Sequence, residues 1–431
     1  MKTTTFFGPP GTGKTRRLVD TIIGHRGERI LMLSFSKAAA LETASRLPDG
    51  MDVKASTIHS LMFNHLGMSR AAMVDGKKLA EFGKEAGFPF KGSETGSDEA
   101  QEGDDYATVK AYANNRMIDD YDAFDMFGQP GTRHRFGMFL KAYQSWKMTY
   151  GYMDFDDMLL SYVHGRGGDL YCPPVVALDE AQDCSPLQWQ VIEKLVAGGA
   201  EHVYVAGDDD QAIFEWNGAD PHGMVRFGDK VGAEYVTLNK SYRVPKRALS
   251  LVNEAILPQF KKRYPKQFDA ADRDGIVERW GDLWNIDFRS LHNSGVGALV
   301  LLRDRFRMDE VKRMLNREMI PYDVLGGGSP WTNRIANALR QGLDPDIPNH
   351  WATFYRQAVR GGHLKETPVI TLSTIHQAKG REHSKVIMDL QLSTRALQNI
   401  YHNRDAELRV MYVGLTRAID ELHICGENPL L

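Results

Sequence analysis

Residues 3–15 read TTTFFGPPGTGKT and decide the fold class of this 431-residue chain. The β-prone residues 3–7 come first, and the helix-compatible RRLVDTII of residues 16–23 follows. The segment between them fits GxxxxGK[ST], a pattern whose backbone N–H groups surround phosphate at the positive end of a helix. The sequence therefore predicts a phosphate-binding loop made of Gly8, Pro9, Pro10, Gly11, Thr12, Gly13, Lys14 and Thr15.

The expected partner of this loop is a strand that ends in acidic residues, and VVALDE at residues 175–180 supplies one. Lys14 would neutralise phosphate oxygens, while Thr15 would bind Mg²⁺ and Asp179 would hold the ion through water. Glu180 could orient or deprotonate the attacking water. An acidic pair at a strand end is otherwise usually a solvated turn, so these roles depend on the presence of the phosphate loop.

Composition excludes several classes of protein. Hydrophobic residues make up 42% and charged residues 25%, as in soluble globular proteins, and no apolar run approaches the ~20 residues that span a bilayer. The net charge of -3 excludes a uniformly basic protein that coats nucleic acid, although local patches can still bind phosphates. Three scattered cysteines argue against a disulfide framework and a structural zinc site. We expect a cytoplasmic protein without a secretory signal.

Short apolar runs separated by helical patterns predict a parallel α/β fold. The expected buried strands are residues 30–33, 175–178, 203–206, 298–302 and 386–390. Apolar stripes at helical spacing include Met308, Val311, Leu315 and Met319, and also Leu408, Met411, Tyr412 and Leu415.

Two interruptions of this pattern predict the domain organisation. Residues about 62–150 form a helix-like, Met- and charge-rich stretch that resembles a subdomain inserted into the first sheet. Within it, the acidic residues 93–105 indicate a mobile loop or a solvated surface. A second α/β unit is expected to begin near Pro245.

Several further segments carry a family signature. DEAQD at 179–183 and GDDDQAIFEW at 207–216 resemble motifs II and III of the UvrD/Rep/PcrA-like superfamily 1 DNA helicases. Seven other segments resemble further motifs of that family and stand in the family's order along the chain. They are SFSKAA at 34–39, TIHS at 57–60, DFDDML at 154–159, SYR at 241–243, IPYDVLGG at 320–327, TLSTIHQAKGRE at 371–382 and MYVGLTRA at 411–418.

The resemblance implies two RecA-like parallel-sheet domains with ATP bound between them. The first domain would be residues 1–243 with the helical insertion at about 62–150. The second would be residues 244–431 with a short insertion at about 328–368. The family moves 3′ to 5′ along single-stranded DNA and hydrolyses ATP, so we expect an ATP-dependent translocase and helicase that acts on single strands and on junctions with duplex.

The resemblance also assigns residues to the nucleotide. Catalytic roles fall on Lys14, Asp179, Glu180, Gln211 as a γ-phosphate sensor, and Arg243 and Arg417 as arginines that reach the phosphates from the second domain. Contacts with the base and ribose fall on Arg16, Tyr242, Gly380 and Glu382, with Tyr242 stacking on the base. A surface arginine usually only solubilises, and a tyrosine among apolar neighbours usually belongs to the core, so these roles depend on the motif match.

A second set of residues matches the DNA track of the family. Phe35, Phe214 and Trp216 occupy positions where bases stack, and Lys37, His59, Thr374 and His376 match groups that contact phosphate or sugar. The alternative is that the three aromatic residues pack in the core and that His376 is a structural histidine.

The chain departs from the family in three places. It begins seven residues before Gly8, without the segment whose glutamine recognises adenine, so we expect weak base discrimination. Only about forty residues separate Gly327 from Val369, where relatives insert a large helical subdomain, so this compact form would unwind duplex poorly alone or need a protein partner. Asn217 replaces the arginine expected after Trp216, which would loosen a phosphate contact.

Two other functions remain open from the sequence. One is a DNA-binding accessory protein that switches with nucleotide but does not hydrolyse it. The other is an NTPase that remodels protein or RNA. A cytoplasmic location, either nucleoid-associated or in a host cell if the source is viral, would suit all three.

Overall fold

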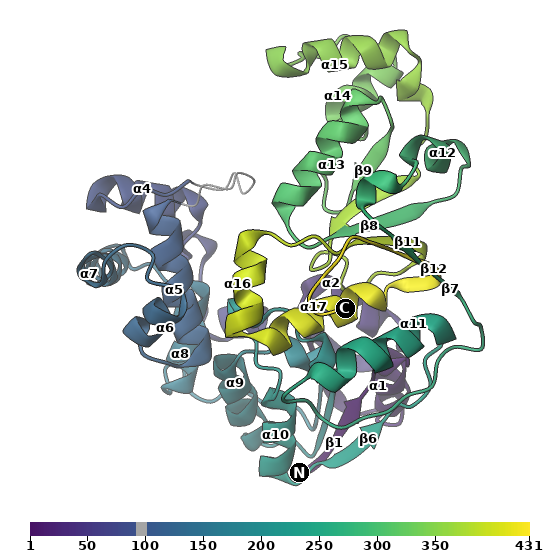
Figure 1. Ribbon diagram of the computed structural model, residues 1–431. Helices are drawn as coiled ribbons and strands as arrows, with labels where there is room; N and C mark the ends of the chain where they lie inside the picture. The colour runs from purple at the N-terminus through teal and green to yellow at the C-terminus, as the bar shows by residue number, and fades with distance from the viewer. Residues whose placement is uncertain (92–100) are drawn as a thin grey trace. The chain divides into compact units, whose positions relative to one another are not determined.

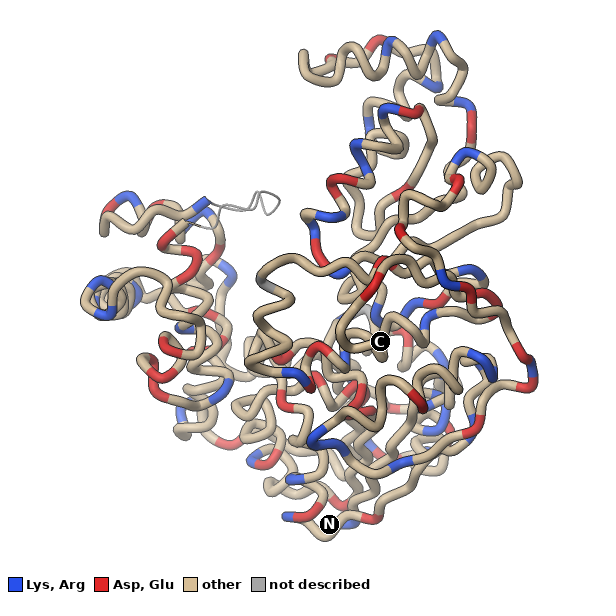
Figure 2. The backbone as a smooth tube through the Cα atoms, in the orientation of Figure 1, with Lys and Arg blue, Asp and Glu red and all other residues tan. Residues whose placement is uncertain are grey.

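The computed structural model describes residues 1–91 and 101–431 of the chain (Figure 1). The described residues form two compact units. The first unit contains Met1–Pro9, Gly13–Leu238 and Arg263–Lys266, and the second contains Pro10–Thr12, Asn239–Lys262 and Gln267–Leu431. Lys and Arg are interspersed with Asp and Glu over both units (Figure 2), in keeping with the small net charge.

The first unit is built on a sheet of six described strands in the order β3-β2-β4-β5-β1-β6. Every neighbouring pair is parallel. The strands are β1 (Lys2–Phe7), β2 (Arg29–Ser34), β3 (Asp52–Ser56), β4 (Val175–Asp179), β5 (His202–Gly207) and β6 (Glu234–Thr237).

Helices connect these strands and cover both faces of the sheet. They include α1 (Lys14–Ile23), α2 (Lys37–Ser45), α3 (Ile58–His65), α9 (Pro186–Ala197) and α10 (Gly223–Val231). Alternate residues of a strand point to opposite faces, so Leu31 and Leu33 of β2 join one core cluster while Ile30 and Met32 join another. A sheet that is buried on both faces explains the continuous apolar runs of the sequence.

Helices between β3 and β4 form a second core within this unit. They are α4 (Gly76–Ala86), α5 (Glu102–Arg116), α6 (Asp120–Met126), α7 (Arg133–Tyr150) and α8 (Phe155–Val163), of which α4 to α7 lie together in the blue part of Figure 1. Their core is mainly aromatic and includes Phe82, Phe88, Phe124, Phe136, Phe139 and Trp146.

The acidic stretch 93–105 is only partly described, because residues 93–100 lie outside the described ranges. Its last part begins α5, so the prediction of a loop is wrong there. Glu102, Asp104 and Asp105 occupy the first turn, where the positive end of the helix dipole stabilises carboxylates. Glu102 also pairs with Arg135 of α7, 3.1 Å away.

The second unit contains another sheet of six described strands, in the order β7-β12-β11-β8-β10-β9. All neighbouring strands are again parallel. They are β7 (Ile276–Trp280), β8 (Ala298–Leu302), β9 (Tyr322–Val324), β10 (Ile370–Thr374), β11 (His383–Asp389) and β12 (Ala418–Cys425). The predicted α/β class with two parallel sheets is therefore confirmed.

The α-helices of the second unit are α11 (Lys246–Leu251), α12 (Phe288–Asn293), α13 (Arg305–Arg317), α14 (Arg334–Arg340), α15 (Asn349–Arg360), α16 (Thr394–His402) and α17 (Arg404–Leu415). Two of them, α13 and α17, carry the predicted apolar stripes, although Met319 lies two residues beyond the end of α13 with φ +52°. Met308, Val311 and Leu315 lie on the buried face of α13, and Leu408 and Met411 are buried in α17.

The short segment at residues 328–368 contributes directly to the core of the second unit. It contains α14 and α15, drawn at one end of this unit in Figure 1. Trp331, Tyr355 and Leu364 of this segment pack in the same cluster as Val300 of β8 and Leu372 of β10. The tyrosine hydroxyl also donates to the carbonyl oxygen of Pro330 at 2.9 Å, which fixes α15 to the loop before α14.

Replacing Trp331 by Ala should lower the free energy of unfolding of the second unit by about 3–5 kcal/mol, because it leaves a large cavity in this cluster. Urea unfolding followed by circular dichroism measures the effect. Tyr401→Ala is the control, since this ring in the same unit is 87% exposed. Equal losses in both variants would contradict a core role for the segment.

Candidate functional site

The predicted phosphate loop leaves the carboxyl end of β1 and leads into α1. The backbone N–H of Gly8 donates to the carbonyl oxygen of Gly207 at 3.0 Å, which fixes the start of the loop beside β5. Gly11 and Gly13 have φ values of +73° and +79°, a conformation that glycine adopts without a steric penalty. The ammonium of Lys14 donates to the carbonyl oxygen of Gly8 at 2.8 Å, so it lies over the loop.

Thr15 and Asp179 come together at the amino end of α1. The threonine hydroxyl donates to the aspartate Oδ2 at 2.8 Å. Burial and the neighbouring Glu180 charge raise the pKa of Asp179 to about 6, although the Thr15 hydrogen bond and Lys14 act in the opposite direction. Both side chains offer oxygen ligands of the kind Mg²⁺ prefers, and atoms this close can face one ion directly or through water. The residues present therefore fit a magnesium ion.

Glu180 stands at a strained position directly after β4. Its φ is +54°, which is uncommon for a residue with a side chain. Its Oε2 accepts a hydrogen bond from Gln182 Nε2 at 2.5 Å, and Gln182 Oε1 accepts from the backbone N–H of Asp208 at 2.9 Å. Asp208 Oδ2 in turn accepts from Gln211 Nε2 at 2.7 Å. The structure thus connects the predicted Glu180 and Gln211 through two intermediate side chains.

In the second unit, the segment 241–243 holds the middle of the phosphate loop. Ser241 Oγ donates to the carbonyl oxygen of Pro10 at 2.7 Å, and the backbone N–H of Tyr242 donates to the carbonyl oxygen of Gly11 at 2.9 Å. A Cβ at Gly11 would overlap Ser241 Oγ and Arg243 Cβ, so glycine is required here. The Tyr242 side chain is 72% exposed and is therefore not a core residue.

Other predicted nucleotide contacts lie near the surface. Arg243 forms an ion pair with Glu382, so these two predicted residues meet within the second unit. Gly380 lies two residues before Glu382, in a turn with φ +80°. In the first unit, Arg16 is exposed, and its Nε lies 3.9 Å from Asp20 Oδ2.

Arg417 has different surroundings from those expected of a residue that contacts a phosphate. It is only 1% exposed. Its Nε donates to the carbonyl oxygen of Val413 at 2.9 Å, and Nη2 lies 3.3 Å from Thr416 Oγ1. Contact with a phosphate would require the guanidinium to leave these acceptors. The role of Arg417 as an arginine that reaches the phosphates therefore stays a prediction.

The predicted DNA-stacking residues of the first unit form one aromatic pair, in which Phe35 is exposed and Phe214 is half-buried, and a separate ring, Trp216. Phe35, which follows β2, stacks on Phe214 with ring centroids 5.4 Å apart and planes inclined by 10°. Phe35 is exposed, as is Trp216, at 59%. Core packing is thus wrong for Phe35 and Trp216.

A cavity of about 570 Å³ lies beside this aromatic pair. Phe35, Phe214 and the predicted His59 line it, together with Asp156 of α8 and Asn115 of α5. Burial lowers the pKa of His59 to about 4, so the imidazole is neutral at pH 7. It can then exchange a hydrogen bond with a ligand but carries no charge.

The remaining predicted DNA contacts are dispersed. Lys37 is exposed at the first position of α2. Thr374 is buried at the end of β10, where its Oγ1 accepts from the backbone N–H of Gln377 at 3.2 Å, and His376 is half-buried in the turn that follows. Thr374 therefore stabilises its own turn.

Sequence reasoning missed several residues that support the site. Gln182 belongs to a recognised motif, but its link between Glu180 and Asp208 has no sequence signal. Lys266 and Arg263 contact Asp208, Asp209 and Asp210 in the first unit. Their only signal was the basic run KKRYPK at 261–266, which complements the acidic run at 208–210.

Two parallel sheets, with a phosphate loop and an acidic strand end on the first, define a P-loop nucleotide-binding α/β protein. The UvrD/REP helicase N-terminal domain matches residues 2–232, and the UvrD-like helicase C-terminal domain matches residues 354–428. The chain belongs to the UvrD/REP helicase family.

Similar proteins differ in how much of their length is matched. YjcD of Bacillus subtilis is 26% identical over 62% of this chain and 38% of its own length. DNA helicase II of Escherichia coli is 31% identical over 35% of this chain and 23% of its own length. A probable DNA helicase of Mycoplasma pneumoniae is 22% identical over 95% of this chain and 77% of its own length. The chain thus spans less than half the length of the first two.

A solved structure of an arterivirus helicase, nonstructural protein 10, aligns with 98% of this chain and 59% of its own. The TM-score is 0.38 at 12% identity, too low to support a conclusion. Within the described residues, no helix is both long and apolar enough to cross a membrane.

Neutralising Asp156 should stabilise the protein at high pH. Burial, the charge of Asp154 and, to a smaller extent, the charge of Asp157 raise the pKa of Asp156 to about 7. Hydrogen bonds from Asn114 and Asn115 act in the opposite direction. The folded state therefore binds the proton more tightly than the unfolded state, and stability falls as pH rises from about 4 through about 7.

Asp156→Asn removes this titration, so its stability relative to wild type should increase over that range, by up to about 1.4 kcal/mol per unit of pKa difference. Urea unfolding at pH 5, 6.5 and 8 measures the change, with the exposed Asp122→Asn as the control. Parallel pH dependence of the wild type and Asp156→Asn would show that the carboxyl group is not titrating as expected.

Proposed function

We propose that this protein is an ATP-dependent motor that moves along single-stranded DNA and acts as a DNA helicase. ATP is its substrate and Mg²⁺ its cofactor. The observation that supports this most directly is the joining of the phosphate loop to the acidic strand end by the 2.8 Å hydrogen bond between Thr15 and Asp179. Membership of the UvrD/REP helicase family supports the identity of the nucleic acid.

The proposed chemistry is the attack of water on the γ-phosphorus of ATP. Lys14, the loop N–H groups and the amino end of α1 bind the phosphate oxygens. Magnesium, when bound near Thr15 and Asp179, supplies positive charge for the leaving phosphate groups. Glu180 orients the attacking water and accepts its proton, and Gln211 responds to the γ-phosphate. The phosphorus–oxygen bond to ADP breaks, which releases ADP and inorganic phosphate.

Arg243 and Arg417 are the proposed arginine fingers. Both arginines would stabilise the charge on the transferred phosphoryl group, as arginine fingers do in related chemistry. Tyr242 would stack on the base, with Arg16, Gly380 and Glu382 around the base and ribose.

The proposed DNA track uses stacking and backbone contacts, which tolerate any base sequence. Phe35, Phe214 and Trp216 would supply the stacking surfaces. Lys37, His59, Thr374 and His376 would contact phosphate or sugar. The exposure of Phe35 and Trp216 supports this role, because a buried ring could not receive a base.

Polarity and unwinding are further parts of the proposal. The family resemblance supports 3′ to 5′ movement. The short segment at residues 328–368, which is packed into its own unit, supports a motor that translocates but separates duplex weakly without a protein partner. Junctions between single and double strands would be its substrates, in the cytoplasm of a cell or of a viral host.

A nucleotide-switched DNA-binding protein without turnover is the second candidate. Glu180 accepts a hydrogen bond from Gln182, and a switch protein without turnover does not need this carboxylate to be aligned. This arrangement favours hydrolysis. An RNA or protein remodelling activity is distinguished by comparing ATP turnover with single-stranded DNA, duplex DNA, RNA and no polymer.

Lys14→Ala should reduce DNA-stimulated ATP hydrolysis to background, because the β- and γ-phosphates lose their counter-charge. Steady-state phosphate release with and without a single-stranded oligonucleotide measures the loss. The nearby exposed Arg17→Ala is the control for a removed positive charge on α1. Full activity of Lys14→Ala would disprove the assigned site.

Trp216→Ala should impair translocation more than basal hydrolysis, since a lost stacking surface removes about 1–3 kcal/mol of base binding. Stopped-flow arrival at a fluorophore on the 3′ or 5′ end of single-stranded DNA measures stepping and also gives its direction. Tyr171→Ala, which removes another exposed ring of the first unit, should step normally. Unchanged stepping of Trp216→Ala would refute the stacking role.

A further inference from the structure

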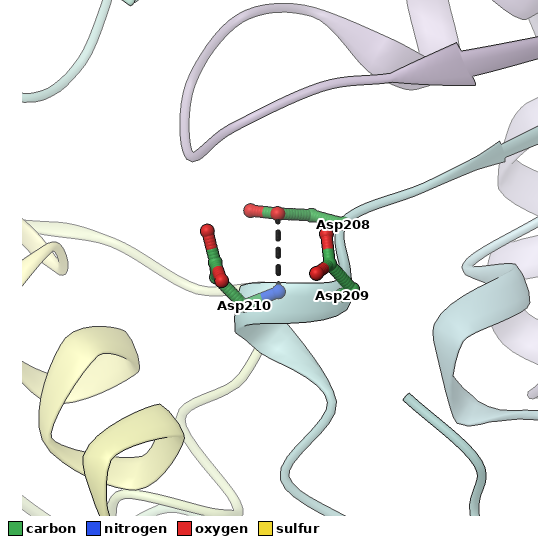
Figure 3. Close-up of side chains that lie close together, drawn as sticks. All are labelled: Asp208, Asp209 and Asp210. Atoms are coloured by element: carbon green, nitrogen blue, oxygen red, sulfur yellow. Dashed lines mark hydrogen bonds between the residues drawn. The ribbon is translucent and has the colours of Figure 1, made fainter. Parts of the chain in front are cut away.

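Three consecutive carboxylates lie buried in the turn after β5. Figure 3 shows Asp208, Asp209 and Asp210 at the start of this turn, with the backbone N–H of Asp210 bonded to Asp208 at 3.3 Å. Carboxylate oxygens of all three lie within 4.8 Å of one another. Each residue has an exposed fraction of 0%. Buried like charges at this spacing strongly oppose folding unless a cation neutralises them.

Lys266 supplies that cation from within the chain. Its side chain is fully buried, and its Nζ lies 3.0 Å from Asp208 Oδ1, 2.5 Å from Asp209 Oδ1 and 2.7 Å from Asp210 Oδ2. An ammonium in contact with all three carboxylates occupies the position a metal ion would take. The cluster is therefore an internal ion network and not a metal centre.

Neighbours of Lys266 hold the same turn in place. Arg263 Nη2 lies 2.6 Å from Asp210 Oδ2, and its Nε is 3.0 Å from Oδ1. The backbone N–H of Tyr264 donates to Asp209 Oδ2 at 2.7 Å. The Tyr264 ring stacks on Phe7, the last residue of β1, with centroids 3.9 Å apart. The segment Arg263–Lys266 is thus fixed to the strand that leads into the phosphate loop.

The turn that Lys266 neutralises also carries the proposed γ-phosphate sensor. Asp208 uses Oδ1 for Lys266 and Oδ2 for Gln211. Its backbone N–H reaches Gln182, which bonds to Glu180. We propose that Lys266 is a positioning residue, which fixes Asp208 and so orients Gln211 for hydrolysis.

The directions in which the pKa values of Lys266 and Asp210 shift agree with this role. Burial lowers the pKa of Lys266, but the charges of Asp208, Asp210 and Asp209 outweigh it and raise the pKa above its ordinary value. Burial likewise raises the pKa of Asp210, and the opposing charges of Lys266 and Arg263 bring it below its ordinary value. Lys266 therefore stays charged throughout the physiological range.

The role of Lys266 rests on the proposed hydrolysis, so two independent measurements test it. Hydrogen–deuterium exchange of the full chain measures how well the backbone of the turn is protected, and this measurement does not depend on ATP hydrolysis. Lys266→Met should speed exchange in residues 207–214 more than Arg263→Met does. The Lys266 variant loses the contacts with Asp208 and Asp210, whereas the Arg263 variant loses only a contact with Asp210. Equal exchange in the two variants, or unchanged exchange in Lys266→Met, would overturn the proposal.

Kinetics then separate positioning from general stability. Lys266→Met should lower kcat for DNA-stimulated ATP hydrolysis about 10- to 100-fold, as expected for misplaced catalytic groups, with KM for ATP changed less than about threefold. Arg263→Met removes a cation from the other side of the cluster and should lower the melting temperature with a smaller loss of kcat. Lys266→Arg, which keeps the charge, should recover part of kcat.

A double-mutant cycle with Gln211→Ala completes the test. If Lys266 acts through Gln211, the double variant should be hardly slower than Gln211→Ala alone. Fully multiplicative losses, or equal losses of kcat in Lys266→Met and Arg263→Met, would show a merely structural role. If the wild type does not hydrolyse ATP, the proposed function fails, and the exchange measurement still decides whether Lys266 holds the turn.

Discussion

The parallel alignment of the strands in the first unit is the constraint on which its site depends. Parallel strands end at one edge of a sheet, so residues that follow different strands meet there. Gly8 follows β1, Glu180 follows β4 and Asp208 follows β5. The hydrogen bond between Gly8 and Gly207 fixes two of these exits side by side. Residues almost two hundred positions apart thereby become neighbours without any long loop reaching between them.

Buried carboxylates at this edge are neutralised in two different ways. Asp179 has a pKa raised to about 6 by burial and by the Glu180 charge, against the Thr15 hydrogen bond, the Lys14 charge and the backbone N–H of Glu180. It is suited to an exchangeable cation that arrives with the nucleotide. The cluster of Asp208, Asp209 and Asp210 instead has a permanent cation in Lys266. A permanent charge keeps the turn in one conformation, whereas an exchangeable one makes the site sensitive to its ligand.

The sequence predicted what is local and missed what is assembled by the fold. The strands at β2, β4, β5, β8 and β11 were visible as apolar runs, because a sheet covered on both faces needs them. The start of α5 was not predicted, because an acidic stretch indicates a loop or a solvated surface, although acidic residues also suit a first helical turn.

Side-chain surroundings were the least predictable part of the site. A motif identifies Arg417 but not its burial against Val413, because that depends on the end of α17 and its neighbours. Lys266 stands more than fifty residues from the carboxylates it neutralises, with no repeated spacing to reveal the pairing.

The contact between Phe35 and Phe214 was also not predictable from the sequence. A base between them would require a ring separation of about 7–8 Å, two contact layers, where 5.4 Å is present. Opening the pair loses about 0.5–1.5 kcal/mol of ring contact, while stacking a base gains about 1–3 kcal/mol. If the pair belongs to the proposed DNA track, these two energies are of similar size, so successive bases would enter and leave without a deep energy minimum at any step.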